Sequence, residues 1–142
     1  MLSFERLMHD HSAIFAAART LGQAVTDQAD ATDLAIGVKR LDAVLAPHLA
    51  LEDLEIYPLL LASRDAGQRI MAEETIAAYA HVADAWRSFA VRWDAKAIQA
   101  DRAGFGAALT SFLDTLGGRV RTENEILYPM ALRAAHIRLR AA

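Results

Sequence analysis

The chain has 142 residues, of which 54% are hydrophobic, and it carries a formal net charge of -3 with a pI near 5.9. This length suffices for a single domain with a substantial apolar core, which we expect to span residues 1–142. The slight acidic excess argues against a dedicated nucleic-acid-binding protein, and the absence of cysteine excludes disulfides, thiolate metal sites and cysteine nucleophiles.

The N-terminal segment "MLSFERLMHDHS" carries charged residues where a signal peptide would need an apolar run. No apolar stretch approaches the roughly 20 residues that span a bilayer. We therefore expect a soluble cytoplasmic protein with neither a nucleic acid nor a membrane as partner. A protein partner or a homodimer remains compatible with the sequence.

The first two predicted helices are joined by the polar linker "TDQADATD". The first runs from about Phe4 to Val25, and its apolar stripe includes His11. In the linker, Thr32 or Asp33 is expected to cap the second helix, which runs from about Leu34 to Ala62.

The third predicted helix covers about Gln68 to Trp93, with Thr75 and Tyr79 on its inner stripe and His81 on its flank. The fourth follows a break at "DAKAIQADRAG" and runs from about Phe105 past Leu132. Four amphipathic helices with short connections predict an all-α, up-down-up-down four-helix bundle.

Four polar residues interrupt the inner stripes of the first, second and fourth helices, namely His11, His48, Glu52 and Glu123. His48 and Glu52 lie one helical turn apart on one face. An ionised carboxylate is costly to bury without a partner, so both glutamates need a cation or hydrogen-bond donors. Two imidazoles and two carboxylates suit iron, manganese or zinc.

The second and fourth helices carry related segments, "APHLALEDLEIYP" at residues 46–58 and "GGRVRTENEILYP" at residues 117–129. They align without a gap, so glutamate, tyrosine and proline recur at matching positions. His48 in the first copy is matched by Arg119 in the second. Pro58 and Pro129 lie late in their helices, where each is expected to kink or end the helix.

These segments resemble the hemerythrin-like, or HHE cation-binding, family. The resemblance is carried by "HDHSAIF", "HLALEDLEIYP" and "RTENEILYP", with "MAEET" at the place where the third helix of the family usually begins with a histidine. It implies a four-helix bundle around a carboxylate-bridged di-iron site. The family uses such sites to bind oxygen, or to sense iron, oxygen or nitric oxide.

When the ligand positions of the family are carried over to this sequence, the resemblance implies that His11 and His48 are the terminal ligands of one iron. It implies that Glu52 and Glu123 are the bridging carboxylates. The ligands expected for the second iron are replaced by Thr75, Tyr79 and Arg119. His81 would reach the site only in an altered helical register.

Arginine keeps its proton and is a poor metal ligand, but it can bind two carboxylates at once. We therefore hypothesise that the Arg119 guanidinium takes the place of the second iron between Glu52 and Glu123. Alternatively, Arg119 extends to the end of the bundle, helped by the glycine pair at residues 117–118.

Oxygen binding at a di-iron site takes one electron from each iron, so the missing ligands argue against an oxygen carrier. We predict a regulatory, sensing or interaction module with at most one metal ion, iron before zinc or manganese, or with none. One alternative is a mononuclear non-haem iron protein or enzyme that uses the same four residues. The other is a metal-free bundle that binds a partner through an apolar patch near Trp86 or Trp93.

Overall fold

The computed structural model describes the backbone of residues 4–141 and the side chains of residues 4–134. This part of the chain is helical and contains no strand. The elements in chain order are α1 (Phe4–Thr26), α2 (Ala31–Leu51), η1 (Glu52–Ile56), α3 (Tyr57–Leu61), α4 (Ala66–Tyr79), α5 (Val82–Arg92), α6 (Ala95–Ala100), α7 (Arg102–Thr122), η2 (Glu123–Leu127) and α8 (Tyr128–Ala141).

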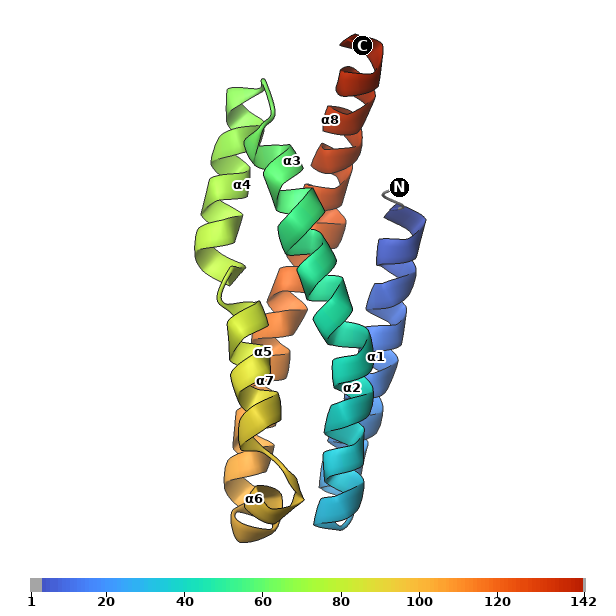
Figure 1. Cartoon of the computed structure of the whole chain (residues 1–142), viewed down its shortest axis with the longest axis vertical. Helices are drawn as coiled ribbons and strands as arrows, with labels where there is room; N and C mark the ends of the chain where they lie inside the picture. Colours follow the sequence, from blue (N-terminus) through green and yellow to red (C-terminus); the bar gives the residue numbers. More distant parts are fainter. Residues whose placement is uncertain (1–3, 142) are drawn as a thin grey trace.

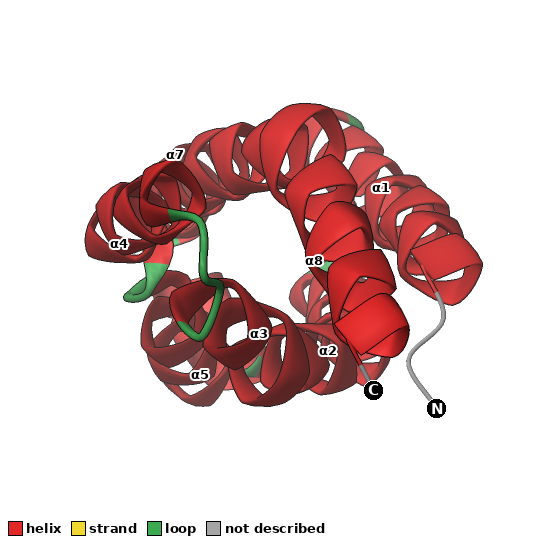
Figure 2. Ribbon diagram, turned by 90° about the horizontal axis from the view of Figure 1, so that it is seen from above, coloured by secondary structure: helices red, strands yellow, loops and turns green. Residues whose placement is uncertain are grey.

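The elements combine into four antiparallel rods, as Figure 1 shows. The rods are α1, then α2 to α3, then α4 with α5, and finally α7 to α8. Seen from above in Figure 2, they lie around one common axis. The prediction of an all-α, up-down-up-down bundle is confirmed.

Aspartates begin four of the helices, because each accepts a hydrogen bond from the backbone N–H three residues later. The distances are 2.8–3.1 Å, and the capping residues are Asp30, Asp65, Asp94 and Asp101. The prediction that Thr32 or Asp33 caps the second helix is therefore wrong, since Asp30 caps α2 and Asp33 supplies the N–H.

The third rod differs from the single predicted helix of residues 68–93. It is divided at Ala80 and His81 into α4 and α5. The backbone carbonyl just before this break, on Tyr79, accepts a hydrogen bond from Arg119 Nη1 at 3.1 Å. The predicted break at residues 94–104 also contains the short helix α6, capped by Asp94.

The second and fourth rods continue through their prolines instead of ending there. Each widens into one π-helical turn, η1 before Pro58 and η2 before Pro129. A proline has no N–H, and its ring clashes with the carbonyl four residues earlier. The wider turn accommodates this, and in both rods it begins at the glutamate of the repeated segment.

The core consists of two apolar clusters along the bundle axis. The larger contains Ile14, Leu45 and Val120, and the smaller contains Leu7 and Ile56. Along each rod, the buried polar residues occur between a member of one cluster and a member of the other. A polar layer is therefore enclosed between two apolar ones.

The third rod supplies an aromatic group to the larger cluster. Trp86 and Trp93 are 1% and 6% exposed, and Trp86 Nε1 donates to Asp42 Oδ1 at 2.7 Å. The expectation that Trp86 or Trp93 contributes to an exposed apolar patch is therefore wrong, because both side chains are buried. Among residues 4–141, no helix has both the length and the apolar character needed to cross a membrane.

Candidate metal centre

The polar layer brings together the four residues singled out in the sequence. His11 comes from α1, His48 from the last turn of α2, Glu52 from the start of η1 and Glu123 from the start of η2. One ligand atom from each lies within 4.8 Å of the others. All four side chains are buried, with at most 3% exposed.

Both histidines are held through the ring nitrogen that faces away from this cluster. His11 Nδ1 lies 2.8 Å from Asn124 Oδ1, and His48 Nδ1 lies 3.2 Å from Asp10 Oδ2. An oxygen acceptor at Nδ1 favours the tautomer with its proton there, which directs the Nε2 lone pair toward the cluster. The Nε2 atom of His11 also lies 3.0 Å from the Tyr128 hydroxyl, whereas that of His48 has no hydrogen-bond partner.

The carboxylates are held by tyrosines in a crossed arrangement. Tyr57 donates to Glu123 Oε2 at 3.2 Å, and Tyr128 donates to Glu52 Oε2 at 2.8 Å. Each tyrosine thus binds the glutamate of the other copy of the repeated segment. This contact explains why both copies carry tyrosine five residues after glutamate.

The other oxygen of each glutamate faces a histidine. Glu52 Oε1 lies 2.9 Å from His48 Nε2, and Glu123 Oε1 lies 3.3 Å from His11 Nε2. Three of these four buried atoms, on His48, Glu52 and Glu123, have no partner with hydrogen-bond geometry. Buried polar atoms are rarely left unpaired, and a cation among them would satisfy all three, so the donor set fits one metal ion.

The pKa values of the two carboxyl groups are shifted in opposite directions. Burial, together with the nearby Glu123, raises the pKa of Glu52 well above its ordinary value. Burial also acts to raise the pKa of Glu123, but hydrogen bonds from Glu52 and His11 and the charge of Arg119 lower it to about 2. The two carboxyl groups therefore lose their protons as a coupled pair.

Arg119 lies beside the same two carboxylates and is fully buried. Its Nε donates to Glu123 Oε2 at 3.3 Å, and its Nη2 lies 3.7 Å from Glu52 Oε1. Nη2 also donates to Asp53 Oδ1 at 3.1 Å. The alternative in which Arg119 extends to the end of the bundle is therefore wrong, because the buried Glu123 and the exposed Asp53 beside the polar layer hold the guanidinium.

The surroundings keep Arg119 charged. Burial lowers its pKa, but the neighbouring acidic groups, Tyr57 first among them, more than compensate and raise it above its ordinary value. The guanidinium also lies over the Tyr57 ring, 5.2 Å from its centroid. The polar layer thus contains one permanent cation in contact with both glutamates.

This set of residues can be compared with known families. Residues 2–131 match the model of the hemerythrin HHE cation binding domain. The chain belongs to this family. Comparisons with curated proteins and with solved structures gave no match. The family match confirms the resemblance, and the pairing of histidines with glutamates around one point is consistent with cation binding by this hemerythrin-like chain.

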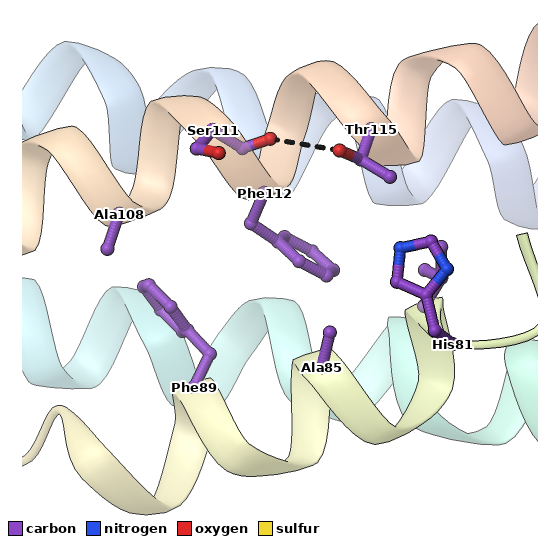
Figure 3. A pocket seen from close by; sticks show the side chains of 8 residues that line it. His81, Ala85, Phe89, Ala108, Ser111, Phe112 and Thr115 are labelled. Atoms are coloured by element: carbon purple, nitrogen blue, oxygen red, sulfur yellow. Dashed lines mark hydrogen bonds between the residues drawn. The ribbon is translucent and has the colours of Figure 1, made fainter.

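The remaining candidates lie apart from the cluster or bind elsewhere. Thr75 is buried, but its hydroxyl donates to the Met71 carbonyl. His81 is exposed at the start of α5, where it lines a pocket between α5 and α7, as Figure 3 shows. His9 is exposed, as expected from its position on the outer face of α1. No register shift brings His81 into the site.

Five residues that contact the candidate ligands or Arg119 were not given these roles from the sequence. They are Asp10, Asp53, Tyr57, Asn124 and Tyr128. Of these five, only the tyrosines could have been singled out from the sequence, since the same residue recurs at matching positions in the two copies. Asp10 and Asn124 look like ordinary polar residues beside a helical stripe, because their partners lie on other rods.

Proposed function

We propose that the protein is a single hemerythrin-like domain, over residues 1–142, that binds one metal ion and serves as a regulatory or sensing module. His11, His48, Glu52 and Glu123 would hold the ion. Iron is the first choice because it suits nitrogen and oxygen donors and is the metal of the family, while zinc and manganese accept the same donors. A redox-active iron would supply sensitivity to oxygen or to the redox state.

The position of Arg119 is the observation that carries the proposal. In a di-iron relative, two cations would share the bridging carboxylates. Here a buried guanidinium contacts both of them, and its charge opposes a second metal ion nearby. We infer that Arg119 supplies the charge of the missing iron. A site with one iron lacks the second electron that is needed to bind oxygen reversibly as peroxide.

Metal analysis of protein purified without added iron tests this function. We expect about one iron, zinc or manganese ion per chain in the wild type, and none after His48→Ala. His9→Ala is the matched control, because this exposed histidine lies near His11 on the same helix and outside the cluster. Two metal ions per chain in the wild type would contradict the one-metal site, and none would leave a metal-free interaction module.

The same residues support one alternative, a mononuclear non-haem iron enzyme, because two histidines and a carboxylate are the ligand set of many Fe(II) oxygenases. Such an enzyme must admit a substrate to the metal. The four ligand side chains are 0–3% exposed, which favours a small diatomic signal over an organic substrate. Oxygen consumption by the iron-loaded protein that depends on an added organic substrate would favour the enzyme.

A further inference from the structure

Another pair of matching positions in the two copies of the repeated segment lies directly after the two glutamates. Asp53 follows Glu52 in η1, and Asn124 follows Glu123 in η2. Each reaches a side chain on another rod. Asn124 Oδ1 lies 2.8 Å from His11 Nδ1, and Asp53 Oδ1 accepts from Arg119 Nη2 at 3.1 Å.

The residue type at each position matches its partner. A neutral amide oxygen binds the ring N–H of His11, and a carboxylate binds the guanidinium of Arg119. A charged acceptor makes the stronger hydrogen bond to a cation. The same backbone position thus orients a metal-ligand candidate in one copy and the substitute cation in the other.

Arg119 Nη2 lies closer to Asp53 than to Glu52. This nitrogen lies 3.1 Å from Asp53 Oδ1 and 3.7 Å from Glu52 Oε1, which is beyond hydrogen-bond distance. Glu52 Oε1 is the oxygen that faces His48 Nε2 and has no hydrogen-bond partner. It is therefore the oxygen that a metal ion would use.

We propose that Asp53 is a positioning residue for the metal centre, which holds Arg119 Nη2 away from Glu52 Oε1 and so leaves that oxygen free to bind metal. This inference rests on the proposed one-metal site. Without Asp53, the guanidinium has only the glutamates as anionic partners. It then turns its free N–H toward Glu52 Oε1 and competes with the metal for that atom.

Titration of metal-free protein with Co²⁺, followed by visible absorption, tests the proposal. Asp53→Asn and Asp53→Ala should weaken Co²⁺ binding by about 10–100-fold, the range typical of changes to residues outside the ligand set of a metal site. Asp53→Glu, which restores a carboxylate, should recover most of the affinity. Glu55→Gln is the control, since it removes the same charge from an exposed position in the same turn.

A second comparison separates positioning from the general effect of a negative charge. In an Arg119→Gln background, no guanidinium competes for Glu52, so Asp53→Asn should change the affinity far less than it does in the wild type. Equal losses in both backgrounds, or a loss as large in Glu55→Gln, would overturn the proposal. If Arg119→Gln does not fold, the Glu55→Gln and Asp53→Glu variants still decide it.

The outcomes also separate this inference from the proposed function. Wild-type protein that binds no Co²⁺ would overturn both. Wild-type protein that binds one Co²⁺ with an affinity unchanged by Asp53→Asn and Asp53→Ala would overturn only the role of Asp53.

Discussion

At the scale of single residues, the exchange of histidine for arginine at position 119 changes what the polar layer can hold. Histidine can be neutral and ligate a metal, whereas arginine remains a cation and can only donate hydrogen bonds. The buried guanidinium therefore balances the carboxylates permanently on its side of the layer. On the other side, three buried atoms still lack partners.

Replacement of Arg119 by alanine should strongly destabilise the metal-free protein. The change leaves buried acidic groups without their cation, and breaking a buried ion pair in this way costs about 3–5 kcal/mol. Urea unfolding in the presence of a chelator measures the effect. Arg121→Ala, an exposed arginine on the same helix, should change the free energy of unfolding little. Unfolding of Arg119→Ala at wild-type urea concentrations would refute the role of substitute cation.

At the scale of elements, the two π-helical turns set the positions of the residues that follow each glutamate, including Asp53 and the two tyrosines. Both start at a glutamate and both precede a proline. The wider turn changes the angle between successive residues. In η1, it allows the neighbouring side chains of Glu52 and Asp53 to approach the same guanidinium. The doubled motif thus encodes a backbone distortion as well as a pair of ligands.

Replacement of Pro58 by alanine restores an N–H and removes the clash that favours the π-helical turn. We expect η1 to revert toward an α-helix, which would rotate Tyr57 and α3 relative to His48 and Glu52 and so disturb the contact of Tyr57 with Glu123. Affinity for Co²⁺ should fall by about tenfold or more, while the stability of the chelated protein is unchanged or higher. An affinity equal to that of the wild type would show that the turn does not position Tyr57 for the metal centre. Pro129→Ala should act in the same way through Tyr128, which donates to Glu52.

At the scale of the whole molecule, the candidate centre links three of the four rods between two apolar clusters. The four candidate ligands come from three segments that lie far apart in the chain, so an unfolded chain cannot present them together. The segments contain His11, the pair His48 and Glu52, and Glu123. The third rod contributes no candidate ligand. It reaches the layer through the Tyr79 carbonyl, which binds Arg119.

Metal should therefore stabilise the folded protein as a whole. An ion that binds only the folded state adds about 2.7 kcal/mol at a free concentration 100 times its Kd. For a chain of this size, we expect Tm to rise by several degrees when Zn²⁺ is added to chelated protein. Calorimetry of the wild type and His48→Ala checks this. An equal rise in both proteins would indicate metal binding outside the cluster.

Much of the fold followed from local patterns. The apolar stripes predicted the rods, and the same stripes identified His11, His48, Glu52 and Glu123 as inward polar residues. The errors arose where a distant residue or a backbone detail decided the outcome. The third helix is divided at Ala80, beside the carbonyl that Arg119 binds. The second and fourth helices continue past their prolines through a π-helical turn, where the sequence predicted either a kink or an end.

The sequence by itself determined the four-rod bundle, the family and the identity of the four candidate ligands, because helical periodicity and the doubled motif depend only on the spacing of residues along the chain. Only the tertiary structure showed where the Arg119 guanidinium lies and which residues hold the ligands in place. Asp53, Asn124 and the crossed tyrosines act on partners from other rods. Such contacts depend on how the rods pack, and no spacing along one helix encodes them.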